Sequence, residues 1–175
     1  CPARLVVNSG AGSALMADLP RLKLVLQTFR KALPIPFTVK MRAGFKECNA
    51  IEVAKLIQDC GADALAIHPR LQTQFFLGTP DYSLAAKVKQ AVTIPVIISG
   101  GVVNWATAKS VYEQTGVDAY LIGRGIWSKP WKLHEMQEHS QGRAYRVEES
   151  VVLASALEHV DAMVEYYGQR GVYAF

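Results

Sequence analysis

The segment from residue 94 to residue 130 contains the pattern that most restricts how this chain can fold. Two short apolar runs, Pro95–Ile98 and Ala119–Ile122, end abruptly at the glycine turns Ser99-Gly100-Gly101 and Gly123-Arg124-Gly125. Continuous apolar runs of this length are typical of parallel strands buried on both faces, because a half-exposed strand alternates with polar residues. The residues between the runs have helical spacing. The segment therefore predicts a strand, a helix and a second parallel strand, with a glycine turn after each strand.

Strand-like runs recur along the chain at a regular period. They begin near residues 37, 64, 95 and 118, and segments with helical spacing separate them. This period is close to the ~30 residues of a strand-helix-strand unit, and it predicts an α/β protein with a parallel sheet. Polar or charged residues follow every strand, as they do at the active-site end of a (β/α)₈ barrel. We therefore expect the C-terminal half of a (β/α)₈ TIM barrel, with a doubly wound sheet as the alternative fold.

The chain is shorter than a complete barrel, which has about 250 residues, because it contains 175. We expect a chain truncated at both ends, with earlier strands upstream of Cys1. The strand-helix period stops after Pro130, where a closing helix at 131–138, a polar connector at 140–146 and a long helix at 147–167 are predicted. Residues 1–139 are thus expected to form the barrel portion, and residues 140–175 to begin a separate helical domain.

Composition restricts the class of protein and its surroundings. Half of the residues are hydrophobic, which is ordinary for a globular chain. The net charge of +4 favours a polyanionic partner without establishing one. The three cysteines lack zinc-ligand spacing, so we expect no metal site and a reducing, cytoplasmic setting. No apolar run approaches the ~20 residues of a membrane-spanning helix, and we expect no membrane association.

If the strands are neighbours, residues at their carboxyl ends converge on one rim. The converging residues are Cys1, Lys40, Arg42, His68, Arg70, Ser99, Gly100, Gly101, Gly123 and Arg124. In a (β/α)₈ barrel the loops after the last two strands frequently bind phosphate, because glycines let backbone N–H groups approach the anion. Arg124 would add a fixed positive charge. The rim therefore predicts a ligand that carries a phosphate group.

Flavin mononucleotide (FMN) is a ligand that suits such a rim. Its phosphate requires backbone amides and an arginine, and the electron-rich N1/O2 edge of its reduced ring requires a cation such as Lys40. His68 can donate a hydrogen bond to the flavin or to a substrate carbonyl. Cys1, which precedes Pro2 and a glycine-rich turn, can act as the general acid that protonates a carbon after hydride transfer.

Each of these residues also has a purely structural explanation. The glycines can form tight strand-to-helix turns, and Lys40 and Arg42 can be solvated charges at the end of a strand. His68 can be a satisfied structural histidine, and Cys1 a packed terminal residue. Two glycine turns separated by one helical connection nevertheless favour the phosphate site.

Six segments, taken in order and spacing, resemble the tRNA-dihydrouridine synthase family, most closely its bacterial B-type branch. They are CPARLVVNSGAGSALM, TVKMRAG, AIHPRLQTQFFLGTPDYS, IPVIISGG, DAYLIGRGIWSKPW and EHVDAMVEYYG. The resemblance extends over nearly the whole chain. It implies an FMN-dependent reduction of the uracil C5–C6 double bond in tRNA, with NADPH, or more generally NAD(P)H, reducing the flavin first.

The resemblance also implies roles for individual residues. Cys1 matches the cysteine that protonates C5 while hydride passes from flavin N5 to C6, and Lys40 and His68 match residues beside the isoalloxazine. Arg42 and Arg70 are candidates for contact with RNA or with the base. The residues implied around the ribityl phosphate are Ser99, Gly100, Gly101, Gly123 and Arg124. The helical segment would bind tRNA, and the enzyme would act as a cytoplasmic monomer.

The chain departs from the family pattern in three respects. Ser99 stands where the family usually has Asn, which shortens a hydrogen-bonding side chain beside the flavin, and Leu71 stands where Thr is usual. The first four barrel strands are absent. Two alternatives therefore remain: another FMN- or phosphate-binding barrel enzyme that acts on a small metabolite, and a non-catalytic RNA-binding fragment.

Overall fold

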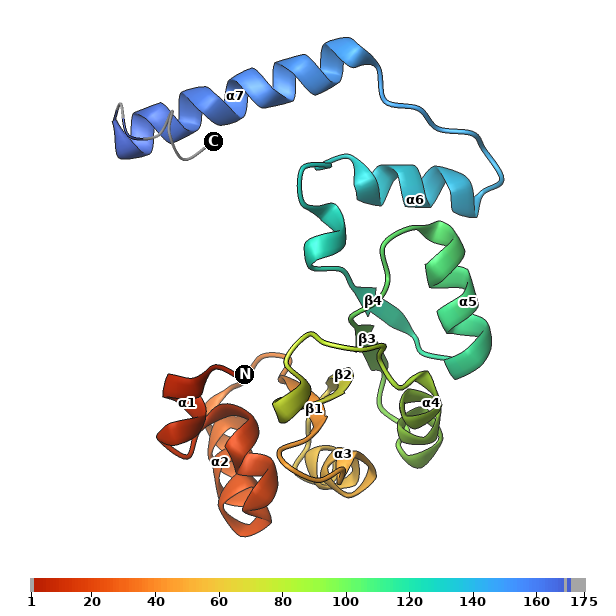
Figure 1. The fold of residues 1–175 in the computed structure, drawn as a ribbon. Coiled ribbons are helices and arrows are strands. Elements are labelled where there is room, and N and C mark those ends of the chain that lie inside the picture. The colour runs from red at the N-terminus through yellow and green to blue at the C-terminus, as the bar shows by residue number, and fades with distance from the viewer. Residues whose placement is uncertain (1, 169, 171–175) are drawn as a thin grey trace. The chain divides into compact units, whose positions relative to one another are not determined.

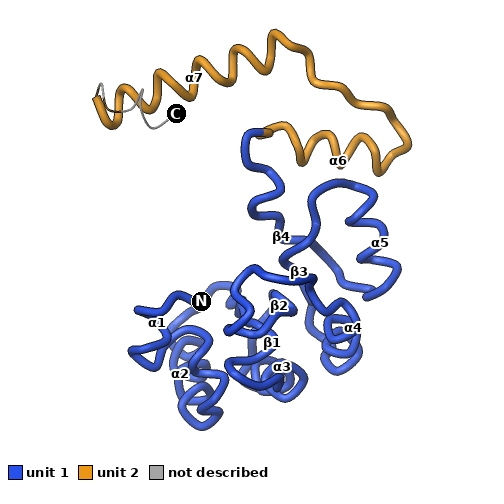
Figure 2. Tube along the Cα trace, viewed as in Figure 1, with its two compact units in different colours: residues 1–128 blue, residues 129–175 orange. Residues whose placement is uncertain are grey.

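A four-stranded parallel sheet forms the centre of the first of two compact units, residues 1–128 and 129–175 (Figure 2). The computed structural model describes residues 2–168 and residue 170. The strands are β1 (Thr38–Gly44), β2 (Ala64–Leu71), β3 (Val96–Ser99) and β4 (Ala119–Leu121). Their order in space follows their order in the chain, and each neighbouring pair is parallel (Figure 1). A doubly wound sheet reverses this order at a switch point, so the predicted α/β fold of partial-barrel type is confirmed.

A helix connects each strand to the next and covers the outer face of the sheet. The connecting helices are α3 (Ala50–Asp59), α4 (Tyr82–Ala91) and α5 (Trp105–Thr115). Helix α3 packs on β1 and β2, and α4 packs on β2 and β3. The shared core includes the almost fully buried side chains Val53, Ile57, Leu65, Ile67, Val88, Val96, Ile98 and Val111. Because each such side chain stabilises the fold by ~1.5–3 kcal/mol, this layer holds the strand ends in place.

Local capping signals set where helices begin. Helix α2 (Leu19–Ala32) follows Asp18, whose carboxylate accepts a hydrogen bond from the backbone N–H of Arg21 at 3.1 Å. The side chain of Asn104 accepts from the N–H of Thr107 at 2.8 Å and caps α5 in the same way. The helix predicted between the last two strands is thus confirmed as α5. Before α2, the chain forms the short helix α1 (Arg4–Asn8) and the 3₁₀ helix η1 (Gly12–Ala17), and residues 2–18 contain no strand.

Two strands extend beyond their predicted ends. The strand-like runs that begin near residues 37 and 64 end in the sequence at Met41 and Ile67, which are the strand ends that the sequence predicts. In the structure β1 continues to Gly44 and β2 continues to Leu71. Pairing of Arg42 with His68, and of Gly44 with Leu71, accounts for the extension. The charged residues expected just after these strands therefore lie inside them, and the sheet itself fixes their positions.

The second unit contains the helices α6 (Lys132–Ser140) and α7 (Glu149–Tyr167). The predicted helices at 131–138 and 147–167 are confirmed to within about two residues, the usual uncertainty of helix ends. The two compact units divide between Ser128 and Lys129, before α6. The domain boundary after residue 139 stays a prediction. None of the helices in the described part of the chain is both long enough and apolar enough to cross a membrane. The chain end at 171–175 lies outside the described residues.

Candidate functional site

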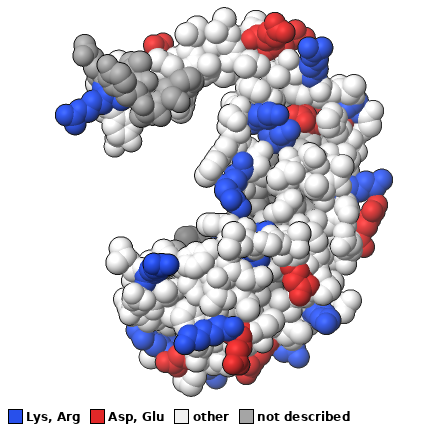
Figure 3. All heavy atoms as spheres, in the orientation of Figure 1, with Lys and Arg blue, Asp and Glu red and all other residues white. Residues whose placement is uncertain are grey.

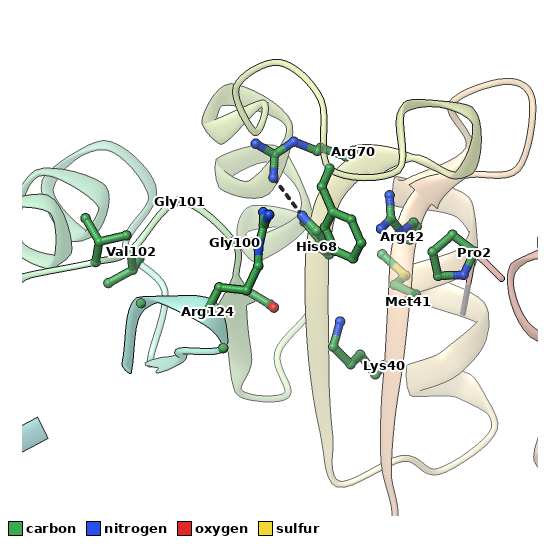
Figure 4. A pocket seen from close by; sticks show the side chains of 15 residues that line it. Pro2, Lys40, Met41, Arg42, His68, Arg70, Gly100, Gly101, Val102 and Arg124 are labelled. Carbon is green, nitrogen blue, oxygen red and sulfur yellow. Dashed lines mark hydrogen bonds between the residues drawn. The ribbon is translucent and has the colours of Figure 1, made fainter. Parts of the chain in front are cut away.

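A pocket of about 630 Å³ lies in the first unit, beside the carboxyl-terminal parts of the strands (Figure 4). This volume is in the range of small-molecule sites. The structure brings nine of the ten predicted site residues to its wall: Lys40, Arg42, His68, Arg70, Ser99, Gly100, Gly101, Gly123 and Arg124. The tenth, Cys1, lies outside the described residues, and its neighbour Pro2 lines the pocket. Segments distant in sequence therefore meet at one site.

Strand alternation places the charged side chains on the pocket side of the sheet. Lys40 and Arg42 are two residues apart in β1, and His68 and Arg70 are two residues apart in β2, so each pair shares a face. The register sets Arg42 directly beside His68. The intervening residue Met41 is buried. The sheet therefore presents four polar side chains in two adjacent rows.

The two glycine turns offer bare backbone to the pocket. Gly100 and Gly101 have φ values of +97° and +82°, a region that residues with side chains rarely adopt. A Cβ atom would lie 2.6 Å from Nε2 of His68 at Gly100, and 2.1 Å from the hydroxyl of Tyr82 at Gly101. A Cβ atom at Gly123 would meet none of the described residues within 4 Å. Packing therefore does not require glycine at position 123, but a ligand lying against the backbone would.

Four cations line the pocket without a carboxylate among the described residues. No Asp or Glu contributes to the described wall, and the ion pairs formed in the described part of the chain include none of Lys40, Arg42, Arg70 and Arg124. Desolvation lowers the pKa of Lys40, and the charge of Arg42 lowers it further. On the face drawn in Figure 3, by contrast, basic and acidic side chains are interspersed. The unneutralised charge of the pocket favours an anionic ligand.

His68 is a neutral hydrogen-bond donor in this pocket. Its Nε2 atom lies 2.9 Å from NH1 of Arg70. A guanidinium has no acceptor, so Nε2 must accept, and the imidazole proton resides on Nδ1. Burial, followed by the charges of the four surrounding cations, lowers the pKa of His68 to about 4. Among the described residues no hydrogen bond involves Nδ1, which leaves its N–H group available to a ligand.

The low pKa of His68 predicts that stability falls in mild acid. An unfolded histidine binds a proton near pH 6.5, whereas folded His68 does so only near pH 4. The free energy of unfolding should therefore decrease as the pH falls from 6.5 to 4, by up to about 3 kcal/mol from this group. Denaturant titrations across that range should show a shallower decrease in the free energy of unfolding for His68→Gln than for the wild type. Equal pH dependence in the wild type and His68→Gln would contradict the prediction.

Arg42 and Arg70 hold the loop that follows β2, residues 71–78. NH1 of Arg42 donates to the carbonyls of Leu71 and Phe75 at 2.9 and 2.6 Å. Nε of Arg70 donates to the carbonyl of residue 77 at 3.1 Å, and its NH2 donates to the carbonyl of residue 78. Every nitrogen of Arg70 thus has a partner. Nε and NH2 of Arg42 form no hydrogen bond within the described part of the chain, so Arg42 retains donors for a ligand.

Phe76, in the same loop, lines the pocket and was not predicted from the sequence. Its ring centroid lies 4.6 Å from the guanidinium carbon of Arg124 and 5.6 Å from that of Arg42. These distances are within the range of cation–π contacts. A single aromatic residue in a loop has no periodic signal, and only its position shortly after a cationic strand end could have indicated it.

Comparison with known proteins assigns the chain to a family. The family model described as dihydrouridine synthase (Dus) matches residues 1–175. The chain belongs to the dihydrouridine synthase family. The resemblance inferred from the six sequence segments is therefore confirmed, and the four strand-helix units are part of the TIM barrel of this family.

Several relatives in the dihydrouridine synthase family are similar to nearly the whole of this chain. It is 37% identical over 173 residues to a probable tRNA-dihydrouridine synthase of Rickettsia bellii, with 97% of this chain and 53% of the relative covered. It is 37% identical over 174 residues to the tRNA-dihydrouridine synthase B of Xanthomonas campestris, with 97% and 52% covered. For the tRNA-dihydrouridine synthase B of Pectobacterium carotovorum the values are 37% over 172 residues, 96% and 54%. The chain spans about half the length of these relatives.

Proposed function

We propose that the protein reduces uridines of tRNA to dihydrouridine, with FMN as the redox cofactor and NADPH as the reductant. The observation that carries this proposal is the pocket with four unneutralised cations and two bare glycine turns, in a chain of the dihydrouridine synthase family. An anionic nucleotide cofactor and a polyanionic substrate are both suited to such a pocket. A monomeric enzyme of the cytoplasm is part of the same proposal.

The residues present fit FMN. Backbone N–H groups at Gly100, Gly101 and Gly123 would bind its phosphate, and Arg124 would supply the charge-assisted hydrogen bond. Lys40 would lie at the N1/O2 edge of the ring, where negative charge develops on reduction. Nδ1–H of His68 would donate to a ring or substrate carbonyl. Ser99 would lie beside the ring and offer a hydroxyl where the family usually has an amide.

In the proposed reaction the pocket residues bind and orient the reactants, and one thiol moves a proton. FMN held by Lys40, His68 and the glycine turns would, after reduction by NADPH, supply hydride for C6 of uracil. Cys1 donates the proton to C5, so that the C5–C6 π bond is replaced by two C–H bonds. The thiolate of Cys1 then recovers a proton from solvent. The Nδ1–H group of His68 and the unbonded nitrogens of Arg42 would stabilise the negative charge that develops on the uracil carbonyl during hydride addition.

Attraction between the cations and the RNA phosphates would hold the RNA, and its target base would have to be extracted to reach the pocket. A uracil stacked in folded tRNA must leave its neighbours before it can reach a pocket of this size. The unpartnered nitrogens of Arg42 make it the better supported of the two arginines for contact with RNA or the base. Arg70, with each nitrogen already bonded, would act mainly through the loop and His68. Residues 140–175 are proposed to bind tRNA.

Replacing Arg124 by Gln should weaken binding of FMN about 10- to 100-fold, because a hydrogen bond to a charged group contributes about 1.5–3 kcal/mol. The affinity for riboflavin, which lacks the phosphate, should fall by less than about threefold. Quenching of flavin fluorescence would measure both affinities. Lys109→Gln, which removes the same charge from an exposed helix position, is the control. Equal losses of affinity for FMN and riboflavin would show that Arg124 does not bind the phosphate.

The proposed function is tested by incubating the protein, expressed from its natural gene, with unmodified tRNA, FMN and NADPH. Dihydrouridine should appear in the tRNA by mass spectrometry, and flavin absorbance should copurify with the protein. Flavin absorbance without any response to tRNA would instead favour an enzyme of small metabolites. Salt-sensitive binding of tRNA without flavin would favour a non-catalytic RNA-binding protein.

A further inference from the structure

A buried glutamine connects the 71–78 loop to the segment that follows Cys1. Nε2 of Gln72 donates to the backbone carbonyl of Pro2 at 3.0 Å, across 70 residues of sequence. The Gln72 side chain is only 8% exposed, so water cannot easily replace this bond. Because proline has no N–H group, this carbonyl is the only backbone hydrogen-bonding group of Pro2. Gln72 is therefore the partner that can fix the backbone at this position.

Gln72 is itself held in place by the sheet. It begins η2 (Gln72–Gln74), a 3₁₀ turn in the 71–78 loop. Arg42, from β1, donates to the carbonyls of Leu71 and Phe75, which flank this turn. The side chain of Gln74 closes the turn by accepting from the N–H of Leu71 at 2.7 Å. A continuous set of hydrogen bonds thus leads from β1 through the turn to Pro2, which lines the pocket.

We propose that Gln72 is a positioning residue for Cys1, because its hydrogen bond fixes the carbonyl of the residue that follows this cysteine. This inference rests on the proposed role of Cys1 as the proton donor. A general acid must lie within about 2.6–3.2 Å of the atom it protonates, and a displacement of about 1 Å can cost about 100-fold in rate. Loss of the single hydrogen bond from Gln72 to Pro2 is therefore expected to slow proton donation by Cys1.

Two substitutions in the protein expressed from its natural gene separate the hydrogen bond from simple packing. Gln72→Met fills a similar volume and cannot donate. Gln72→Glu has nearly the same shape, cannot donate as a carboxylate, and can donate once it is protonated. Gln27→Glu, the same chemical change at an exposed position of α2, is the matched control.

The rate at which iodoacetamide alkylates Cys1, resolved from Cys48 and Cys60 by mass spectrometry, reports on positioning without any need for turnover. Both Gln72 variants should alkylate at Cys1 about five- to thirtyfold faster than the wild type and the control, because a restraint on the segment is lost. Dihydrouridine formation in a single turnover should slow about 10- to 100-fold, with unchanged affinity for FMN. Lowering the pH should restore the turnover of Gln72→Glu toward that of the wild type, and should not restore that of Gln72→Met.

Other results would contradict either the positioning role of Gln72 or the proposed function. Unchanged Cys1 alkylation in both variants, or equal losses without recovery of Gln72→Glu in acid, would overturn the positioning role. Faster alkylation of Cys1 in variants of a protein that forms no dihydrouridine would leave the positioning role in place and contradict the proposed function.

Discussion

Replacing Cys1 by Ala is expected to lower the rate of dihydrouridine formation by about 100- to 10,000-fold, the range that a positioned general acid contributes. Without the thiol, C5 of uracil must take its proton from water, which the pocket neither orients nor activates. Binding of FMN should not change, because the predicted flavin contacts come from Lys40, His68 and the glycine turns. Single-turnover oxidation of the reduced flavin by unmodified tRNA measures the loss.

The matched control for Cys1 is Cys48→Ala. Cys48 is an exposed free cysteine that does not line the pocket, and its replacement should leave turnover within about twofold. Cys1→Ser, whose hydroxyl is a much weaker acid, should resemble Cys1→Ala more than the wild type. If Cys1→Ala keeps more than about a third of the wild-type rate, Cys1 is not the proton donor.

Replacing Gly101 by Ala should destabilise the first unit by about 2–5 kcal/mol and abolish copurification of flavin. The backbone at Gly101 has a φ of +82°, which costs a residue with a side chain about 1–2 kcal/mol. The new Cβ would also lie 2.1 Å from the hydroxyl of Tyr82, and relieving such an overlap costs about 1–3 kcal/mol. Any shift of this turn would displace the backbone proposed to bind phosphate. Denaturant unfolding and the flavin absorbance of the purified variant measure the two effects.

Two further variants separate backbone strain from the steric overlap at Gly101. Gly116 also has a positive φ, +65°, but a Cβ there would meet none of the described residues within 4 Å. Gly116→Ala should therefore cost only about 1–2 kcal/mol and leave flavin bound. Adding Tyr82→Phe to Gly101→Ala removes the overlapping hydroxyl and should recover part of the lost stability. Equal losses for Gly101→Ala and Gly116→Ala would show that the overlap with Tyr82 is unimportant.

The order of the strands and the meeting of the site residues could be predicted from the sequence. Apolar runs that end in glycine mark the ends of β3 and β4, and the carboxyl ends of parallel strands lie at one edge. Strand length could not be predicted in the same way. Charged residues such as Arg42 and Arg70 end an apolar pattern in the sequence, although pairing between β1 and β2 continues through them.

The contacts made by buried polar side chains could not be predicted. Lys40, Arg42, His68 and Arg70 were expected as charged or polar groups of an open rim. The structure shows that Arg42 and Arg70 are 4% and 6% exposed. Apart from the bond between Arg70 and His68, their hydrogen bonds go to backbone carbonyls of the 71–78 loop. Backbone carbonyls are identical in every residue, so no sequence pattern indicates which of them a guanidinium will bind. The bond from Gln72 to Pro2 is hidden for the same reason.

The central claim is that one cation-lined pocket binds the flavin phosphate at its glycine turns and receives the Cys1 thiol beside the flavin ring. A crystal structure of the protein with FMN tests this most directly. We expect the phosphate to lie against the backbone of Gly100, Gly101 and Gly123 and within hydrogen-bonding distance of Arg124. We expect the ring to lie beside Lys40, with the Cys1 sulfur facing it. A phosphate bound away from both glycine turns, or a Cys1 sulfur directed away from the pocket, would contradict it.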